Sequence, residues 1–375
     1  MKKTLVFDIE MTGHHLEYLH HLYCAAGQKV NEEFVFAFPE SFDDVSSNFE
    51  WPYYSNITIH YLKGYDVVKV KCNILKRSYY LSKLLKKTAK DLQITHIFLI
   101  VLMQFLPFLP FFLNKKYKVS GIVYQIYLYR WKQSSVFTKL QDVFKYLSLS
   151  NFNIFEKVFL LNENSAPHYL NKKYKTNKFY NLVDPVVPII GNDIRNMRED
   201  LEILNKTKVI LHLGTMSKTK GTLEIFEALG VMRKEEYTNY TFIFAGKVQD
   251  DIKESFYKMY NKFKDKVQII LFDEFCSFEF MGSLLLTCDI ILCPYKRTSQ
   301  SSGIIGYAAQ FGKIVIVPKK GMLAKLVRNY KLGLFFENDT PYGIINAIEK
   351  TEICSPNNNY LEMNSIKNFT KAILK

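Results

Sequence analysis

The 375-residue sequence lacks several patterns that would assign it to a protein class at once. None of its six cysteines forms a C-x-x-C pair, and most lie in apolar runs, as expected for reduced core thiols in a cytoplasmic protein. No G-x-x-x-x-G-K-[ST] motif occurs, which excludes a P-loop. No signal peptide is visible, because only a few apolar residues precede Asp8. Internal repeats and low-complexity tracts are absent, which excludes solenoid and fibrous classes.

Positive charge is concentrated in one part of the chain. Residues 1–50 hold 3 Lys and Arg against 9 Asp and Glu, whereas residues 51–183 hold 21 against 5. A local excess of this size indicates an anionic partner, either nucleic acid or a lipid surface. No nucleic-acid recognition motif accompanies the charge, so we expect an anionic membrane surface rather than nucleic acid.

Residues 94–113 form a stretch without Asp, Glu, Lys or Arg that is nominally long enough to span a bilayer. Pro107 and Pro110 would break a helix there, and two polar side chains lie within it. We therefore interpret 96–102 as a buried parallel strand followed by a loop or short helix. Contact of its Phe- and Leu-rich part with a membrane interface stays open.

The second half of the chain alternates apolar runs with amphipathic segments of helix length, which predicts a parallel, doubly wound sheet. The expected strands are 209–214, 240–246, 267–272, 289–295, 313–318 and 332–336.

The first half repeats this alternation less clearly, with a basic amphipathic helix expected over 73–93 and another helix over 134–147. Its expected strands are 4–10, 32–38, 56–62, 96–102, 118–129 and 156–163. The predicted fold class is α/β, with two doubly wound, Rossmann-like domains facing a cleft. We expect a first domain over 1–185, a linker over 186–207, a second domain over 208–358, and a C-terminal helix over 359–375 that could cross back to the first domain.

The first strand-to-helix turn of the second domain reads H-L-G-T-M-S-K-T-K-G-T-L, residues 212–223. It places Gly214, Lys218, Lys220 and Gly221 at the mouth of a helix, which suits a diphosphate. A solvated loop with ordinary lysines is the alternative. A second small-residue turn follows 289–295, where Ser302 is either a simple N-cap or, with Ser301 and Gly303, part of a phosphate-binding helix start.

These pieces together resemble the second domain of GT-B glycosyltransferases, in particular family four, which uses nucleotide-diphosphate sugars. The similar segments are G-T-M-S-K-T-K-G at 214–221, FIFAG at 242–246, CDIILCPY at 288–295, FGKIVIVPKKG at 311–321 and the junction NLVDP at 181–185. The SSG motif with an early G-H-H-x-E-Y resembles bacterial surface-polysaccharide glycosyltransferases. The resemblance implies donor contacts at Gly214, Lys220, Gly246 and Tyr295.

The sequence departs from the family pattern at three positions. Thr215 replaces the arginine that accompanies Lys220, although Lys218 could supply the missing charge. The two family glutamates fall on Ser299 and Tyr307, neither of which can act as a carboxylate. Donor phosphate contacts would then depend on Ser301, Ser302 and Gly303.

The turn G-H-H-L-E-Y, residues 13–18, is the first strand-to-helix turn of the first domain. Gly13 would allow close backbone approach, His14 or His15 could bind the leaving phosphate or act as a base, and Glu17 is the nearest carboxylate. Two alternatives are a metal site from His14, Glu17 and His21 on one helical face, and a helix with plain surface histidines.

Two further features concern ligands. No D-x-D pair occurs, so we expect the diphosphate to be bound without a metal ion, and we expect no cofactor besides the donor sugar nucleotide. Glu274, after an expected strand, could accept from the ribose or base, or be an ordinary surface carboxylate.

Lys76, Lys83, Lys87 and Lys90 lie close to one face of the 73–93 helix, which is either a membrane-surface face or a solvated one.

The sequence therefore predicts a metal-independent, hexosyltransferase-like enzyme that is peripheral at the cytoplasmic membrane face. By resemblance, its acceptor is a lipid-linked glycan of a surface polysaccharide and it retains anomeric configuration. Catalysis would consist mainly of positioning and of stabilising the departing diphosphate. A nucleotide-sugar epimerase and a non-catalytic sugar- or lipid-binding partner with a decayed site are the alternatives.

Overall fold

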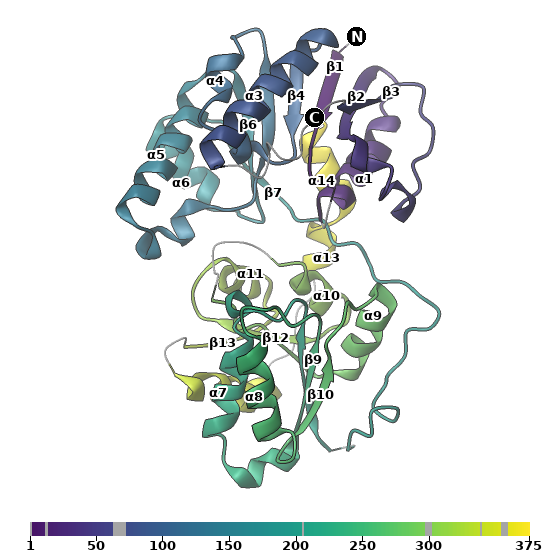
Figure 1. The fold of residues 1–375 in the computed structure, drawn as a ribbon, viewed down its shortest axis with the longest axis vertical. Coiled ribbons are helices and arrows are strands. Elements are labelled where there is room, and N and C mark those ends of the chain that lie inside the picture. Colours follow the sequence, from purple (N-terminus) through teal and green to yellow (C-terminus); the bar gives the residue numbers. More distant parts are fainter. Residues whose placement is uncertain are drawn as a thin grey trace. The chain divides into compact units, whose positions relative to one another are not determined.

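The computed structural model describes residues 2–11, 14–62, 73–204, 206–296, 302–337, 340–353 and 359–375. The chain divides into two compact units, one formed by Met1–Val183 with Ile366–Lys375 and the other by Asp184–Ser365 (Figure 1). The expected linker 186–207 lies within the second unit, and the C-terminal segment belongs to the first unit from Ile366 onward.

The first unit is built on a parallel sheet with strand order β3-β2-β1-β4-β5-β6-β7. The strands are apolar runs, because both faces of a sheet of this kind are covered by other elements. They are β1 (Lys2–Phe7), β2 (Glu32–Pro39), β3 (Ile57–Leu62), β4 (His96–Leu99), β5 (Lys118–Val123), β6 (Phe155–Leu161) and β7 (Phe179–Leu182).

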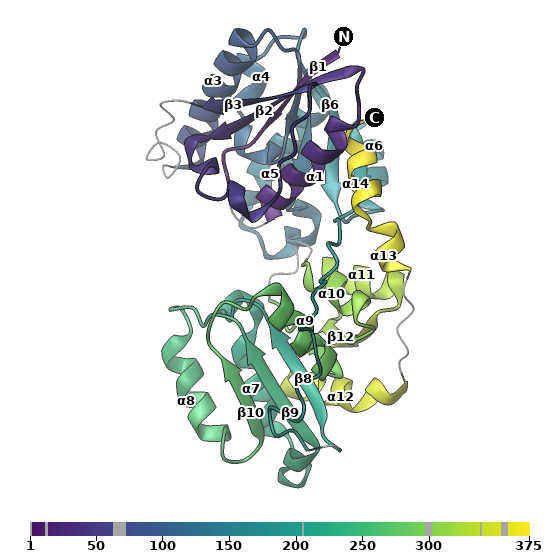
Figure 2. The ribbon, with the colours of Figure 1, turned by 90° about the vertical axis from the view of Figure 1, so that its right-hand side faces the viewer.

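Helices cover both faces of this sheet. Right-handed crossovers place α3, α4 and α5 on one face, and α1 and α14 pack together on the other (Figures 1 and 2). The rings of Tyr18 in α1 and Phe369 in α14 lie 4.9 Å apart in the buried core. The helices are α1 (His14–Gly27), α3 (Ile74–Asp91), α4 (Leu109–Phe112), α5 (Val136–Asn151), α6 (Ala166–Tyr174) and α14 (Ile366–Ile373).

The second unit has a parallel sheet with strand order β10-β9-β8-β11-β12-β13. The order reverses between β8 and β11, and in open α/β sheets ligands bind beyond the carboxyl ends of the strands at such a point. The strands are β8 (Lys208–Leu213), β9 (Tyr240–Ala245), β10 (Gln268–Phe272), β11 (Ile290–Leu292), β12 (Ile314–Pro318) and β13 (Gly333–Phe336).

The helices of the second unit form a layer on each face of its sheet. On one face α7 packs against both α8 and α12, around buried rings of Phe226, Phe244 and Phe256. The opposite crossover direction places α9, α10 and α11 on the other face (Figure 2). The helices are α7 (Thr222–Val231), α8 (Lys253–Phe263), α9 (Phe278–Thr287), α10 (Ile304–Gln310), α11 (Met322–Tyr330), α12 (Pro341–Glu349) and α13 (Tyr360–Met363).

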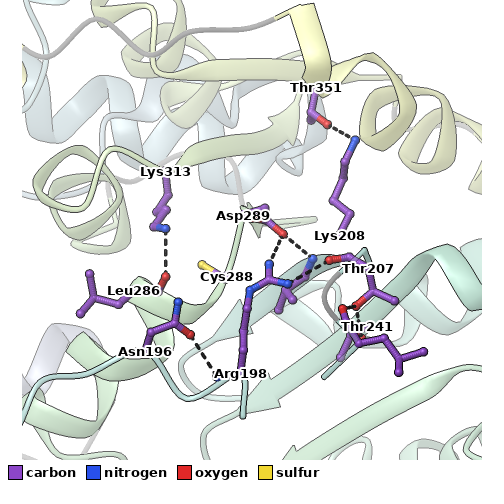
Figure 3. Close-up of polar contacts among 12 residues, drawn as sticks. Asn196, Arg198, Thr207, Lys208, Thr241, Leu286, Cys288, Asp289, Lys313 and Thr351 are labelled. Carbon is purple, nitrogen blue, oxygen red and sulfur yellow. Dashed lines mark hydrogen bonds and ion pairs between the residues drawn. The ribbon is translucent and has the colours of Figure 1, made fainter. Parts of the chain in front are cut away.

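Polar contacts fix segment 186–207 to the amino edge of the second sheet (Figure 3). Arg198 Nη2 donates to Asp289 Oδ2 over 2.7 Å, and its Nη1 donates to the carbonyl of Thr207 over 3.1 Å. Lys208 Nζ donates to Thr351 Oγ1 and Lys313 Nζ to the carbonyl of Leu286. These cations bind groups of the chain itself, so this edge has a structural role.

The predicted fold class is confirmed, since both halves are Rossmann-like units. Several boundaries were wrong: the strand expected over 118–129 ends at Val123, and that expected over 289–295 spans Ile290–Leu292. Helix α6 and strand β7 were missed, because they are short and their sequence is rich in lysine and asparagine.

Residues 94–113 form β4, a 3-10 turn at Leu102–Phe105 and the short helix α4. A strand followed by a short helix was expected, but the strand predicted over 96–102 ends at Leu99. No helix in the described ranges is long and apolar enough to cross a membrane.

Candidate active site

Two neighbouring strands of the second unit end at glycines with positive φ. Gly214 follows β8 at φ +105° and Gly246 follows β9 at φ +136°. A Cβ at Gly246 would lie 2.2 Å from the carbonyl oxygen of Gly214, so only glycine fits there. At Gly214 itself, no described atom lies within 4 Å of the position a Cβ would take. Its backbone is therefore open to close approach by a ligand.

A buried polar network holds the turn after β8. His212 Nδ1 lies 3.1 Å from the carbonyl of Leu292, and its Nε2 lies 3.0 Å from Thr222 Oγ1. Because a carbonyl only accepts, Nδ1 donates and Nε2 accepts from the hydroxyl. Thr222 Oγ1 accepts from Ser217 N, and Ser217 Oγ accepts from Lys220 N. The network thereby positions the backbone of Lys220.

Lys220 is a partly buried cation at this edge of the sheet. Its Nζ lies over the ring of Tyr295, 3.9 Å from the centroid. Burial lowers the pKa of Lys220, and the neighbouring thiol of Cys293 acts in the opposite direction. Among the described residues no carboxylate pairs with Lys220. An anionic ligand would compensate this charge, which is costly to bury alone.

The turn around Lys220 packs directly on the chain that follows β11. A Cβ at Gly221, which has φ +68°, would lie 1.8 Å from the carbonyl oxygen of Pro294. Lys296 N donates to the carbonyl of Thr219 over 3.0 Å, and its Nζ pairs with Glu224 in α7. The two turns on either side of the β8–β11 switch point therefore form one structure.

A pocket of about 310 Å³ opens beside this structure. Tyr295 and Lys296 line it together with Glu224 and Glu227 of α7, while Phe336 lies at the end of β13. The pocket thus extends along the carboxyl ends of β11, β12 and β13, where this fold binds ligands.

The second predicted phosphate turn is partly described. Ser301 and the family-glutamate position Ser299 lie outside the described residues. Gly303 is the N-cap of α10 and no side chain caps the helix, so the simple N-cap interpretation of Ser302 was wrong. Ser302 instead forms a hydrogen bond with the side chain of Tyr295. It thereby joins the group around Lys220.

The remaining donor candidates of the second unit are exposed. Thr215 and Lys218 lie on the outer side of the turn, and Lys218 N donates to Asp251 Oδ2. Glu274 is exposed after β10, whereas its neighbour Asp273 accepts from Val248 N over 2.8 Å. Glu274 thus follows β10, which β9 separates from β8 in the sheet.

The first unit places a buried carboxylate behind His15. Asp8 follows β1 directly, and its Oδ1 accepts from the backbone N–H groups of Ile9 and Glu10 over 2.7 and 3.1 Å. Its Oδ2 lies 2.8 Å from His15 Nδ1 in the first turn of α1. Burial raises the pKa of Asp8, although its hydrogen bond with His15 acts in the opposite direction. The ring of His15 stacks on Tyr124, 5.8 Å between centroids.

The other ring nitrogen of His15 faces a second carboxylate. His15 Nε2 lies 3.5 Å from Glu10 Oε2. Glu10 Oε1 accepts from Arg77 Nη2 over 2.5 Å and from Gln104 Nε2 over 2.9 Å. Burial alone would raise the pKa of Glu10, but these hydrogen bonds and the charges of His15 and Arg77 lower it overall. With Asp8 holding Nδ1–H, Nε2 is the nitrogen that can bind an anion or accept a proton.

The other candidates in this turn are Gly13, His14 and Glu17. Gly13 and the side chain of His14 lie outside the described part of the chain. Glu17 Oε1 lies 4.0 Å from His21 Nε2, one turn further along α1. Within the described residues, no three His, Cys, Asp or Glu side chains are arranged to hold a metal ion.

Comparisons with known proteins agree with the fold described above. Residues 193–368 match the family of glycosyl transferases group 1. The structure of Anabaena Alr3699/HepE in complex with UDP has a TM-score of 0.69 at 14% identity, covering 100% of this chain and 98% of that one. The chain has the GT-B fold.

Two further GT-B structures are similar over nearly the whole chain. A glycosyltransferase from Rickettsia africae ESF-5 has a TM-score of 0.66 at 14% identity, with 100% and 97% of the two chains covered. WaaG, a glycosyltransferase involved in lipopolysaccharide biosynthesis, has a TM-score of 0.63 at 12% identity, with 98% and 94% covered. No curated protein matches in sequence. The family match and these folds support a GT-B glycosyltransferase.

The sequence alone did not predict most of the side chains that surround His15. Asp8 was assigned to the interior of the first strand, although it is the first residue after it. Its position at a strand end was the available signal, since carboxyl ends of parallel strands meet at one edge. Arg77 and Gln104 belong to distant segments, and no sequence pattern connects them to Glu10.

Acid destabilises the GT-B fold through His212. Burial lowers the pKa of His212 to about 4, whereas an unfolded histidine titrates near 6.5. Between these values the unfolded chain binds a proton that the folded chain does not, so stability falls as pH falls, by about 2 to 3 kcal/mol at pH 4.5. Urea unfolding at pH 7.5 and 4.5 should show that the free energies of unfolding of wild type and His212→Gln differ less at the lower pH. If the difference in unfolding free energy is the same at both pH values, the pKa of His212 is not lowered in the folded protein.

Proposed function

We propose that the chain transfers a sugar from a nucleotide-diphosphate donor to a glycan acceptor in surface-polysaccharide biosynthesis. The acceptor is lipid-linked, and the protein works at the cytoplasmic face of the membrane, with its basic segment 51–183 against anionic lipid. The observation that most strongly supports the donor is the partly buried Lys220, which has no described carboxylate partner at the β8–β11 switch point.

The second unit would bind the donor diphosphate. Lys220 supplies positive charge, the open backbone of Gly214 allows close approach, and Ser302 adds a hydroxyl beside Tyr295. Fixed charges and dipoles of this kind stabilise a departing diphosphate without reorganisation. Thr215 and Lys218 are exposed at the mouth of the turn, where they can contact outer phosphate oxygens.

The first unit would supply the titratable group. Asp8 orients His15, whose Nε2 can donate to a phosphate oxygen or accept the proton of an acceptor hydroxyl. We propose that transfer retains the anomeric configuration, as the family resemblance implies, and that it needs neither metal nor cofactor. NMR of the product anomer and activity in EDTA test these two statements.

Nucleotide binding tests the donor proposal directly. Thermal unfolding of the purified chain with UDP, GDP, CMP or dTDP, with and without EDTA, should show stabilisation by one nucleotide that survives EDTA. At about 100 times the dissociation constant a ligand adds roughly 2.7 kcal/mol, which shifts the midpoint by a few degrees. UDP comes first, because Anabaena HepE was solved with UDP-glucose.

A non-catalytic binding partner is the second candidate, and one observation favours it. Tyr307, at a family-glutamate position, lies against the ring of Phe278, 6.5 Å between centroids. An aromatic pair there cannot bind hydroxyls as a carboxylate does. Absence of stabilisation by any nucleotide would favour this candidate, whereas slow hydrolysis of a sugar nucleotide would exclude it.

A further inference from the structure

Helix α5 is inverted relative to an ordinary surface helix. Its solvent face has no charged residue and consists of Gln141, Asn151 and large apolar side chains. The apolar members are Val136, Phe137, Leu140, Phe144 and Leu147, with exposed fractions of 74%, 70%, 65%, 52% and 39%. Amphipathic helices of soluble proteins place such residues toward the core instead.

The inner face of α5 is the more polar one. Asp142 is buried and accepts from Arg130 Nη2 over 2.5 Å. Ser148 and Ser150 are also buried, and their hydroxyls donate to backbone carbonyls one turn earlier. Turning the helix over would separate Asp142 from Arg130, which lies outside α5, whereas the serine hydroxyls bond to carbonyls of α5 itself. The outward apolar face is a stable feature of this fold.

The apolar face continues onto the two neighbouring helices. After α5, the ring of Phe152 lies 5.9 Å from that of Phe111, an exposed residue of α4. Phe112 of α4 in turn lies 5.2 Å from Tyr79, which is exposed on α3. We call the side chains of α5 named above, together with Phe152, Phe111 and Tyr79, the α5 surface. Contiguous apolar surface on this scale marks an interaction site.

The charges around the α5 surface are almost all positive. Residues 73–152 contain 13 Lys and Arg, two Asp and no Glu, and Asp142 is one of the two. Lys139 Nζ lies 5.5 Å from the ring centroid of Trp131, and Lys86 Nζ lies 5.9 Å from that of Phe112. Lysines that lie along apolar side chains can keep their ammonium groups in the headgroup region.

We propose that the α5 surface inserts into the headgroup and acyl boundary of a bilayer that contains anionic phospholipid. Exposed aromatic and aliphatic side chains with basic residues around them are the composition of interfacial helices. A second copy of this chain fits the surface less well, because its lysines would be brought against each other. This inference rests on the proposed function, which places the protein at the membrane. It assigns the membrane contact to α5 rather than to the basic face of α3.

Vesicle co-sedimentation of the full chain tests the proposal. Wild type should sediment with phosphatidylcholine vesicles containing phosphatidylglycerol, and more weakly with phosphatidylcholine alone. Phe137→Ser/Phe144→Ser should weaken this partitioning at least about tenfold, since the apolar area available for insertion falls. Val136→Ser should weaken it less, and its matched control Val30→Ser should not weaken it, although both valines are 74% exposed in the first unit.

The outcomes are separable. Failure of wild type to bind either vesicle, or equal binding by the double variant, would overturn the proposal. So would a dimer in solution that the double variant abolishes, because the surface would then bind a second copy. Unchanged thermal unfolding of the variants excludes misfolding, and their response to nucleotides tests the donor site independently. If the protein binds vesicles but no nucleotide raises its thermal stability, the α5 surface is supported as a membrane contact and the proposed glycosyltransferase activity is contradicted.

Discussion

Replacing Lys220 with methionine lowers the affinity for a nucleoside diphosphate about 100-fold, because removing one partner of a desolvated charge pair costs about 2 to 5 kcal/mol of binding free energy. Methionine is an unbranched side chain of similar length, and it removes the ammonium group that lies over the ring of Tyr295. Because burial lowers the pKa of Lys220, the lysine costs free energy in the empty protein. The ligand-free variant should therefore be as stable as wild type or more so, a combination expected of a binding residue.

Isothermal titration with the nucleotide found in the thermal screen measures the affinity, and thermal unfolding measures the stability of the ligand-free variant. Lys262→Met is a matched control, since Lys262 Nζ lies over the ring of Phe263, 5.2 Å from its centroid, in α8 of the same unit. It should bind nucleotide as wild type does. Unchanged affinity in Lys220→Met would remove the main support for the donor site.

Replacing Asp8 with asparagine lowers kcat by about 100-fold or more and leaves the donor dissociation constant nearly unchanged. The asparagine Oδ1 can still accept from the N–H groups of Ile9 and Glu10. Its amide then faces His15 Nδ1, which must accept instead of donate, so the ring proton moves to Nε2. The nitrogen turned toward Glu10 can no longer accept a proton.

Steady-state kinetics and the pH dependence of kcat distinguish this positioning role from a structural one. Asp142→Asn is the control, because Asp142 is as buried as Asp8, at 3% exposure, and pairs with Arg130 in the same unit. It should lower stability without changing kcat. A fall of kcat in both variants, or a shared pH profile of Asp8→Asn and wild type, would show that Asp8 only stabilises the fold.

The fold could be predicted because burial on both faces of a parallel sheet leaves a repeated signal in the sequence. Apolar runs such as 240–246 and 314–318 can be recognised without knowledge of their neighbours. Strand β11 was harder, since Cys293, Pro294 and Tyr295 are also apolar but belong to the turn that packs on Gly221. Burial alone does not distinguish a strand from a turn that lies inside the protein.

The site could be predicted only where it follows the chain locally. The turn with Lys220 was found because its glycines and lysines are consecutive, and His15 because it starts a helix after a strand. The partners of His15 could not be found in this way, since Arg77 comes from α3 on the other face of the sheet. The apolar face of α5 was visible as a helical pattern, but its inversion depends on the pairing of Asp142 with Arg130.

Helix α14 has a consequence for how the protein is made. The core of the first unit contains Phe369 against Tyr18, and the ammonium group of Lys29 binds the carbonyl of Leu374. Ribosomal synthesis delivers these partners after the whole second unit, so the half that is translated first cannot complete its core until Ile366–Lys375 has left the ribosome. The second unit is continuous in sequence, so it needs no segment made after Ser365 to complete its own core.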